Sequence, residues 1–312
     1  MTLPGLLLAS AVAGAQAPPP PIVNGETTSD WPAVGMLAAY DESSGEVSVF
    51  CSATLVADQA VVTAAHCAEA ALTYDNWGLD AIFVVGSDIT EPVDYVPVGD
   101  WVEHPDYYFD GTGVAADVAV GLLADPLAVD VDPMPMHTDD LGTAWYDQDL
   151  TLVGFGITGD NRVDAGTKRT TTLPVLTRDG DFVYAVDSDP DGSNACSGDS
   201  GGAALRQGQD GWELVGVLSF VFSYYDAGTS CIGGGVGATR VDVYGDWVQG
   251  EAGSDGDGGS VEGDPPGGTG SGGDNPFLEG EEGGCSSLPG AASLGPLGLA
   301  MAALGRRRRR GR

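Results

Sequence analysis

Basic residues are scarce in this 312-residue sequence, which carries 12 Lys and Arg against 46 Asp and Glu. Six of the 12 stand in the last seven residues, so the rest of the chain contains only six. The formal net charge of −34 makes a nucleic acid or an anionic lipid surface an unfavourable partner for the folded part of the chain. The acidity is better explained as a solvated surface that serves solubility or salt tolerance.

Metal-ligand spacings such as HExxH and CxxC are absent, and the sequence predicts neither a metal nor a cofactor. Acidic residues between Asp75 and Asp88 offer oxygen ligands for calcium, but no spacing among them defines a site. Long apolar runs are also rare in residues 22–249. The apolar residues, 42% of the chain, form short runs interrupted by Gly, Asp and Pro, a pattern that favours many short strands over long helices.

Six of these runs predict β-strands, because each is rich in β-branched and aromatic residues and is bounded by turn formers. They are Val47–Thr54, Gln59–Ala64, Ala81–Val85, Thr151–Phe155, Phe182–Val186 and Trp212–Phe222. Residues 22–249 therefore form one all-β body. Its last segment, Val241–Gln249, is apolar enough for a short amphipathic helix.

The segments outside this body differ from it in composition. Residues 1–17 are apolar and end in Ala-Gln-Ala, which fits a signal peptide, and the prolines at 18–21 form a short propeptide. Residues 250–284 are rich in Gly, Ser, Asp, Glu and Pro, as in a disordered linker. Residues 285–312 contain Cys285, an apolar stretch and an arginine cluster, and predict a tail that contacts a membrane.

Five cysteines indicate an oxidising compartment. Four lie within the body (51, 67, 196 and 231), and Cys285 stands alone. An even set with one left over predicts two disulfides and one cysteine that has another role. Disulfides form in exported proteins, which agrees with the predicted signal peptide.

The strongest chemical signal is the segment Gly198-Asp199-Ser200-Gly201-Gly202. A serine hydroxyl becomes a good nucleophile only when a base removes its proton, and histidine is the side chain suited to that role near neutral pH. The chain has three histidines: His66 follows an apolar run, whereas His104 and His137 are predicted to be surface or structural residues. Asp117 lies among apolar residues and is the candidate acid that orients the base, with Asp106 and Asp110 as alternatives.

The segments TAAHC (63–67), ADVAV (116–120) and CSGDSGG (196–202) carry His, Asp and Ser in the order that resembles the chymotrypsin/trypsin family of serine peptidases. The resemblance covers about residues 22–249. It implies two packed antiparallel six-stranded β-barrels with a short C-terminal helix. It also implies that His66, Asp117 and Ser200 form a catalytic triad, and that the backbone N–H groups of Gly198 and Ser200 form an oxyanion hole.

Further roles follow from the same resemblance. It implies the disulfides Cys51–Cys67 and Cys196–Cys231. In the family a new N-terminal ammonium pairs with the acid that precedes the nucleophile, which here means Ile22 with Asp199. Pro21, rather than Arg or Lys, precedes Ile22, so a different peptidase is expected to expose that residue.

The family alignment also places a substrate pocket. It is formed by Asn194, Ala195, Ser219, Phe220, Val221 and Val236. Asn194 stands where trypsins carry a carboxylate, and Val221 stands where deep pockets have Gly. The resemblance therefore implies a preference for small or medium apolar side chains at P1, the substrate residue before the cleaved bond. Ser219 to Val221 are expected to pair with the substrate backbone.

The tail resembles the C-terminal surface-sorting tags of myxobacteria, in which the cysteine, here Cys285, is the processing and anchoring point. This resemblance implies a sorting peptidase as a partner, with an uncleaved membrane anchor as the alternative. The sequence thus predicts an exported, monomeric serine endopeptidase that acts on proteins or peptides at the outer cell surface or after secretion. Two alternatives stay open: a catalytically silent binding homologue displayed at the surface, and an esterase, which GDSGG disfavours relative to GxSxG.

Overall fold

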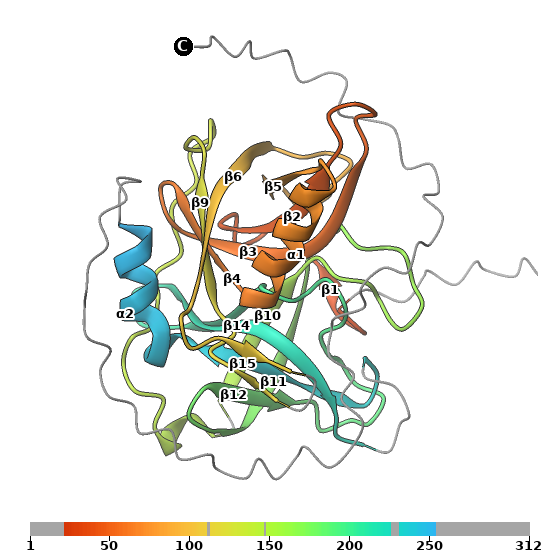
Figure 1. Ribbon diagram of the computed structural model, residues 1–312. Helices are drawn as coiled ribbons and strands as arrows, with labels where there is room; N and C mark the ends of the chain where they lie inside the picture. Colours follow the sequence, from red (N-terminus) through yellow and green to blue (C-terminus); the bar gives the residue numbers. More distant parts are fainter. Residues whose placement is uncertain (1–21, 111–112, 147, 226–230, 254–312) are drawn as a thin grey trace, which may run out of the picture.

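The computed structural model describes residues 22–253, apart from 111–112, 147 and 226–230 (Figure 1). These residues form two six-stranded antiparallel β-barrels, which confirms the predicted all-β fold. The first barrel closes in the order β2-β3-β4-β9-β6-β5. Its strands are β2 (Val34–Tyr40), β3 (Val47–Ala57), β4 (Ala60–Thr63), β5 (Asp80–Val85), β6 (Asp94–Glu103) and β9 (Ala119–Leu123).

The second barrel is a ring of six strands closed by the pairing of β11 with β12. A short strand, β1 (Glu26–Thr27), adds to the outer edge of β11. The strands of the ring are β10 (Asp149–Gly154), β11 (Arg169–Arg178), β12 (Phe182–Val186), β13 (Ala203–Gln207), β14 (Trp212–Ser223) and β15 (Gly234–Arg240). Smaller elements are the hairpin β7 (Tyr108–Phe109) with β8 (Val114–Ala115) and the 3-10 turn η1 (Thr143–Trp145).

Each barrel has an apolar interior. Leu37, Phe83 and Val120 are fully buried in the first barrel, and Leu152 and Val215 are fully buried in the second. The residues that fill these cores are mostly Val, Leu, Ala and Phe on strands, as the short apolar runs predict. All six predicted strands are found: β12 has its predicted bounds, β4 is one residue shorter at each end, and the other four extend one to three residues beyond one predicted end.

Two disulfides stabilise the described part of the chain, and both have the predicted pairing. Cys51 in β3 is bonded to Cys67, which follows His66 directly. Cys196 is bonded to Cys231, with their Cα atoms 5.0 Å apart. The first bridge joins the wall of the first barrel to the segment that carries His66, and the second links the Ser200 loop to the chain before β15.

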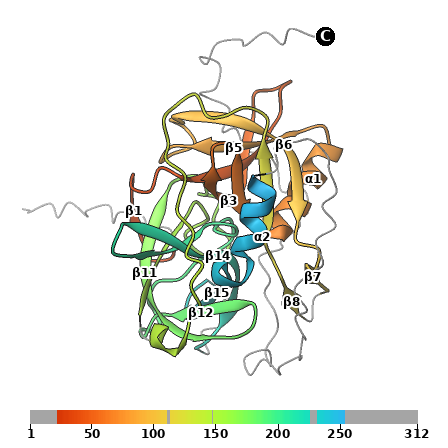
Figure 2. The ribbon, with the colours of Figure 1, turned by 90° about the vertical axis from the view of Figure 1, so that its left-hand side faces the viewer.

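Two helices complete the described structure. The sequence did not predict α1 (Ala65–Asn76), which begins one residue before His66. Helix α2 (Val241–Ala252) confirms the predicted C-terminal helix and extends three residues beyond Gln249, into the segment predicted as linker. Figure 2 shows α2 beside the barrels, where it contacts β9 and β14, and its buried residues are Val241, Gly245 and Val248.

Several predicted segments lie outside the described residues. They are the signal peptide at 1–17, the propeptide at 18–21, the remainder of the linker and the tail with Cys285. Among the residues that the structure does describe, neither helix is long and apolar enough to cross a bilayer.

Candidate active site

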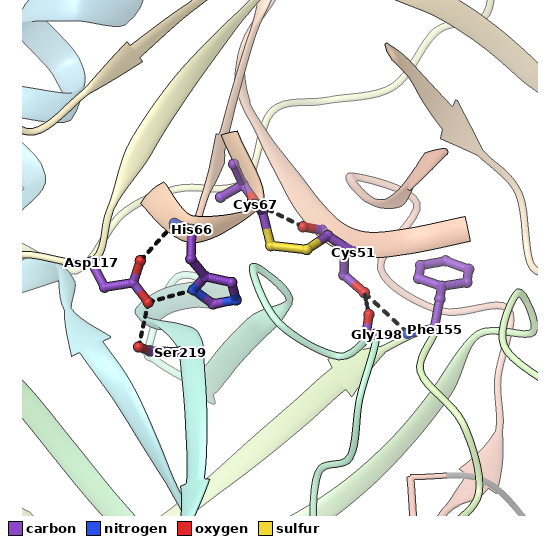
Figure 3. Close-up of a disulfide and its surroundings, with 9 residues drawn as sticks. Cys51, His66, Cys67, Asp117, Phe155, Gly198 and Ser219 are labelled. Carbon is purple, nitrogen blue, oxygen red and sulfur yellow. Dashed lines mark hydrogen bonds and ion pairs between the residues drawn. A yellow bond between two sulfur atoms is a disulfide. The ribbon is translucent and has the colours of Figure 1, made fainter. Parts of the chain in front are cut away.

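His66 and the buried Asp117 form a pair beside the first barrel. The Asp117 carboxylate is 2.8 Å from His66 Nδ1 through Oδ2, and its Oδ1 accepts the backbone N–H of His66 at 3.0 Å (Figure 3). The side chain of Asp117 is 1% exposed, whereas the His66 side chain is 20% exposed. The imidazole is therefore fixed on its Nδ1 side, and only part of the ring borders solvent.

The position of His66 follows from the start of α1. Ala64 is the N-cap residue and has no side-chain oxygen to accept the free N–H groups of the first helical turn. Asp117 supplies that oxygen from a distant segment, and the positive end of the helix favours its negative charge. Ala116, directly before it, has a positive φ of 46°, a strained conformation for a residue other than glycine. The fold thus holds the carboxylate in place at some conformational cost.

His66 and Asp117 shift each other's pKa in opposite directions. Burial alone lowers the pKa of His66, but the charge and hydrogen bond of Asp117, assisted by the charge of Glu69, outweigh burial and raise it. Burial alone raises the pKa of Asp117, but His66, Ser219 and the His66 N–H lower it below its usual value. Asp117 therefore stays ionised, and a proton on His66 is stabilised.

Ser219 is a third partner of this pair that the sequence analysis assigned only to the substrate pocket. Its hydroxyl donates to Asp117 Oδ2 at 2.5 Å. Thr239 also donates its hydroxyl to the backbone carbonyl of Asp117. These two residues belong to β14 and β15 of the second barrel, so the acid that orients His66 is held by both barrels.

The loop with Ser200 is attached to the strand that carries Cys51. Ser52 donates its backbone N–H to the carbonyl of Ser200 at 2.8 Å and its hydroxyl to the carbonyl of Gly198 at 2.9 Å. Because Cys51 is also bonded to Cys67, this one segment of β3 connects the Ser200 loop with the start of α1. Figure 3 shows the His66 ring between Asp117 and the segment that contains Gly198. His66 Nε2 has no hydrogen-bond partner among the described residues.

Gly198 requires glycine for two reasons. Its φ is +93°, a region that other residues rarely adopt, and a Cβ there would lie 2.9 Å from the Cα of Gly156. The close approach of the two segments is completed by the N–H of Ile157, which donates to the carbonyl of Ser197. The Ser200 loop therefore has a defined backbone shape.

Asp199 stabilises this shape from inside the barrel. Its Oδ1 accepts the N–H of Gly156 at 2.8 Å, and its Oδ2 accepts the N–H of Cys196 at 2.9 Å. The residue is 1% exposed, and burial raises the pKa of its carboxyl to about 6. Ile22, its predicted partner, is fully buried among apolar residues of the second barrel.

A small pocket adjoins Ser200 and contains most of the predicted substrate-binding residues. It is lined by Ala195, Cys196, Asp199, Ser200, Leu218, Ser219, Phe220, Val221 and Val236. Val221 and Val236 are cross-strand partners in β14 and β15. Asn194 is fully buried, donates its N–H to the carbonyl of Val23, and does not belong to these nine lining residues.

One edge of β14 beside this pocket is open to a substrate strand. The pairing of β14 with β13 ends at Val217, whereas its pairing with β15 continues to Ser223. Phe220 and Val221 therefore pair with β15 on one side, Ser219 stands at a bulge between Leu218 and Phe220, and the other edge fits the predicted pairing with a substrate backbone.

Comparison with known proteins agrees with this geometry. The trypsin family model matches residues 22–248. The chain belongs to the trypsin family.

Individual relatives are more distant. The chain is 29% identical over 228 residues to the CLIP domain-containing serine protease B15 of Anopheles gambiae, covering 64% of this chain and 60% of that one. It is also 29% identical to a trypsin of Phaedon cochleariae, over 65% of this chain and 78% of the relative. The chain is 26% identical to a brachyurin of Leptuca pugilator, over 65% of this chain and 88% of the relative. The chain spans less than two thirds of several of these relatives, among them an ovochymase of Halocynthia roretzi, of which it covers 13%.

The other two histidines of this trypsin-family chain lie in structural settings, in keeping with their prediction. The His104 ring packs between Tyr244 and Trp247 of α2, with ring centroids 4.9 and 4.8 Å apart. His137 Nδ1 is 2.9 Å from Glu213 Oε2. Clusters of metal-ligand type within the described residues involve Cys51 with Cys67 and Cys196 with Cys231, whose sulfurs are engaged in disulfides.

Proposed function

We propose that the chain is an exported serine endopeptidase that hydrolyses peptide bonds through Ser200, His66 and Asp117. The observation that carries the proposal is the pairing of His66 with the buried Asp117, near a GDSGG loop that Ser52 of β3 bonds at Gly198 and Ser200. Membership of the trypsin family supports it. A base fixed on one nitrogen, with the other nitrogen lacking a partner, suits proton transfer from a hydroxyl.

The mechanism follows the family's acyl-enzyme chemistry. Ser200 Oγ forms a bond to the carbonyl carbon of the substrate, and its proton moves to His66 Nε2. The C–N bond then breaks, and His66 gives the proton to the departing amine. A water molecule attacks the resulting ester, its proton passes through His66, and Ser200 regains its hydroxyl. Asp117 stabilises the imidazolium that forms in both steps and stays ionised throughout.

The oxyanion is assigned to the backbone N–H groups of Gly198 and Ser200. The contacts of Ser52 and Asp199 support this assignment because they hold the loop on both sides before any substrate arrives. Donors that are already oriented need little reorganisation during the reaction. One such donor typically contributes about 3 kcal/mol to transition-state stabilisation.

Full activation is assigned to an ion pair between the ammonium of Ile22 and Asp199. Burial raises the pKa of the Asp199 carboxyl to about 6, and a neighbouring cation would stabilise its ionised form. Because Pro21 precedes Ile22, a proline-removing peptidase rather than a trypsin-like enzyme is proposed to expose the ammonium. N-terminal sequencing of the most active fraction tests this step: Ile22 is the expected first residue, and Pro18 contradicts it.

The pocket favours substrates with small or medium apolar P1 side chains. Val221 and Val236 face each other across β14 and β15, and their branched side chains narrow the cavity. The residues that line the pocket offer one carboxylate, Asp199, which is engaged by two backbone N–H groups and is reserved for Ile22. A panel of chromogenic peptides tests this preference, and strong cleavage after Arg contradicts it.

Export and display complete the proposal. Two disulfides require an oxidising compartment, which supports the signal peptide at 1–17. The linker and the tail from Cys285 to Arg312 are assigned to surface attachment, with a sorting peptidase as the processing partner. The proposed substrates are proteins or peptides, and the proposed working form is a monomer.

Labelling with a fluorophosphonate probe tests the catalytic assignment. The expected result is labelling of the wild type and loss of labelling in Ser200→Ala. A folded wild-type chain with Ile22 at its N-terminus that resists the probe would instead favour a silent binding homologue. Comparison of amide with ester substrates excludes the esterase alternative if amides are cleaved.

A further inference from the structure

Ser52 is a buried polar residue at the place where both barrels meet the Ser200 loop. It lies in β3 of the first barrel and is fully buried. Its hydroxyl donates to the carbonyl of Gly198 at 2.9 Å and accepts the N–H of Phe155, directly after β10 of the second barrel, at 3.1 Å. These bonds are the two dashed lines that end at Gly198 and Phe155 in Figure 3. The hydroxyl therefore joins three segments that are distant in the sequence.

The hydrogen of this hydroxyl has one direction. The N–H of Phe155 can only donate and the carbonyl of Gly198 can only accept, so the Ser52 oxygen accepts the first bond and its hydrogen makes the second. Consecutive bonds of this kind polarise one another, and each is stronger in a buried site than in water. Without the hydroxyl, the buried N–H of Phe155 would lose its acceptor and the carbonyl of Gly198 would be released.

The main chain of Ser52 is bound to the same loop. Its N–H donates to the carbonyl of Ser200 at 2.8 Å, and its own carbonyl accepts the hydroxyl of Thr63 at 2.9 Å. The loop comes so close that a Cβ at Gly201 would lie 2.2 Å from the carbonyl oxygen of Ser52. Main-chain bonds are open to every residue except proline, whereas the bond to Gly198 needs a side-chain hydroxyl. The identity of residue 52 therefore acts on Gly198 in particular.

Gly198 depends on its neighbours for its conformation. It has no Cβ and a φ of +93°, so sterics restrain its backbone dihedrals less than those of other residues. The peptide group before it carries the Gly198 N–H that is assigned to the oxyanion. The carbonyl of the same peptide group, on Ser197, points the opposite way and accepts the N–H of Ile157 at 2.8 Å. This bond fixes one of the two peptide planes that meet at Gly198.

The second plane belongs to the peptide group between Gly198 and Asp199. Ser52 holds the carbonyl of this group, and its N–H, on Asp199, donates to the carbonyl of Cys196 at 3.1 Å. Because the plane is held on both sides, the ψ of Gly198 is restrained as well as its φ. Loss of the Ser52 hydroxyl removes one of these two restraints and leaves the other. The loop should then keep its overall course, while the N–H of Gly198 points less accurately at the oxyanion.

We propose that Ser52 is a positioning residue for the oxyanion hole. Its hydroxyl fixes the carbonyl of Gly198 and thereby directs the N–H of Gly198. Ser52 is fully buried, so it acts on a substrate only through the loop. The same hydroxyl is held by Phe155, which makes the shape of the oxyanion hole depend on the contact between the two barrels. This inference rests on the proposed serine-peptidase function.

The test compares a peptide ester with its thionoester, in which sulfur replaces the carbonyl oxygen. Sulfur is a weaker hydrogen-bond acceptor, so a thionoester gains less from the donors of an oxyanion hole. Both substrates carry the same P1 residue and the same leaving group. We would measure kcat and KM for the full chain as wild type, Ser52→Ala and Ser52→Thr. Titration with a fluorophosphonate gives the concentration of reactive Ser200 in each preparation.

Thr54→Val is the matched control. Thr54 lies two positions further along β3, so its side chain points to the same side of the strand as that of Ser52. It is also fully buried, but its hydroxyl has no hydrogen-bond partner among the described residues. Valine has nearly the shape of threonine, so this variant removes a buried hydroxyl from β3 without releasing a bond.

The expected result is a loss that falls mainly on the oxygen substrate. Removal of an oxyanion donor typically lowers kcat by about 100-fold to 1,000-fold. Ser52→Ala misdirects the donor without removing it, so kcat for the ester should fall by about tenfold, with KM changed by less than about twofold. For the thionoester, kcat should fall by less than about threefold. Ser52→Thr and Thr54→Val should keep the wild-type ratio of the two kcat values within about twofold.

Three results overturn the proposal. They are an unchanged kcat of Ser52→Ala for the ester, an equal loss of this variant with both substrates, which would mark a purely structural role, and a Thr54→Val that lowers the ratio as much. If Ser52→Ala yields no folded protein, Ser52→Thr decides: a wild-type ratio supports the proposal, and a folded variant that has lost the ratio overturns it. The proposed function fails in a different way, since then the wild type hydrolyses neither substrate and does not react with the fluorophosphonate.

Discussion

Ser219 donates its hydroxyl hydrogen to the same oxygen of Asp117, Oδ2, that His66 Nδ1 contacts. The acid therefore receives one bond from each barrel at a single atom, with a third bond from the His66 N–H at its other oxygen. Three donors around a carboxylate that is 1% exposed leave it little freedom to rotate. The relationship makes the orientation of His66 depend on the contact between the two barrels.

Replacement of Ser219 by alanine is expected to lower both kcat and the free energy of unfolding. The lost bond is made to a charged group, and such bonds contribute about 1.5–3 kcal/mol, of which a part serves catalysis. We expect kcat to fall by about threefold to tenfold. Removing this donor leaves the ionised carboxylate of Asp117 a stronger acceptor for His66 Nδ1–H, so the pKa of His66 rises and the acid limb of the kcat profile moves to higher pH.

Ser223→Ala is the control for that measurement. Ser223 ends the same strand, and its hydroxyl donates to the carbonyl of Tyr225, away from Asp117. A kcat of Ser219→Ala equal to that of the control would show that Asp117 does not need this bond.

The sequence predicted the chemistry of the site better than its supports. His66, Asp117 and Ser200 lie in short motifs whose residue types are tied to the predicted roles, and the structure brings His66 and Asp117 together, whereas the role of Ser200 stays a prediction. The bond of Ser219 to Asp117 joins residues 102 positions apart, and nothing in the local sequence of either indicates the other. The bond from the Gly156 N–H to Asp199 likewise joins residues 43 positions apart.

In the fold, too, the elements with a local sequence signal were predicted, and an element that depends on a tertiary contact was not. Strands such as Phe182–Val186 were predicted because their apolar residues are consecutive and bounded by turn formers. Helix α1 was not, because Ala64 offers no side-chain cap and the helix presents a weak apolar pattern. Its start is stabilised by Asp117, a tertiary contact that overrides the poor local signal.

Val221→Gly is expected to widen the substrate pocket. The change removes a branched side chain from the wall that faces Val236, while glycine remains compatible with the pairing of β14 and β15. We expect kcat/KM for peptides with Phe at P1 to rise by about tenfold or more relative to peptides with Ala. Val163→Gly, at an exposed loop position, is the control. An unchanged ratio would mean that Val221 does not limit the pocket.

Removal of the Cys51–Cys67 disulfide is expected to destabilise the protein. The bridge closes a loop of 16 positions, for which chain entropy gives about 3 kcal/mol. The double variant Cys51→Ala, Cys67→Ala should have a free energy of unfolding lower than that of wild type by about 3 kcal/mol, and it should unfold at a lower urea concentration. Its kcat should also fall, because the bridge joins the β3 segment that holds the Ser200 loop to the segment that carries His66. An unchanged unfolding midpoint would contradict the assigned role.

Asp199 is expected to make the stability of the uncut chain depend on pH. Burial raises the pKa of its carboxyl to about 6 in the folded state, above the value of 3.8 for the exposed group. The protonated acid therefore stabilises the fold below about pH 4, and this contribution is lost as the pH rises through about 6. Between pH 4.5 and 7.5 the loss amounts to about 2 kcal/mol.

This pH-dependent contribution of Asp199 is measured by urea unfolding of the Asp199→Asn variant and of its parent. Both proteins carry Ser200→Ala to prevent self-cleavage. Other carboxyl groups titrate equally in parent and variant, so the difference in their free energies of unfolding isolates Asp199. That difference should move by about 2 kcal/mol in favour of the variant from pH 4.5 to 7.5. Asp210→Asn, in the exposed turn between β13 and β14, should show no such movement.

After cutting before Ile22 the trend should reverse, because the new ammonium stabilises the ionised carboxylate of Asp199 and lowers its pKa. A difference that is flat with pH in both forms would mean that Asp199 is paired equally well before and after cutting, and that activation works by another route.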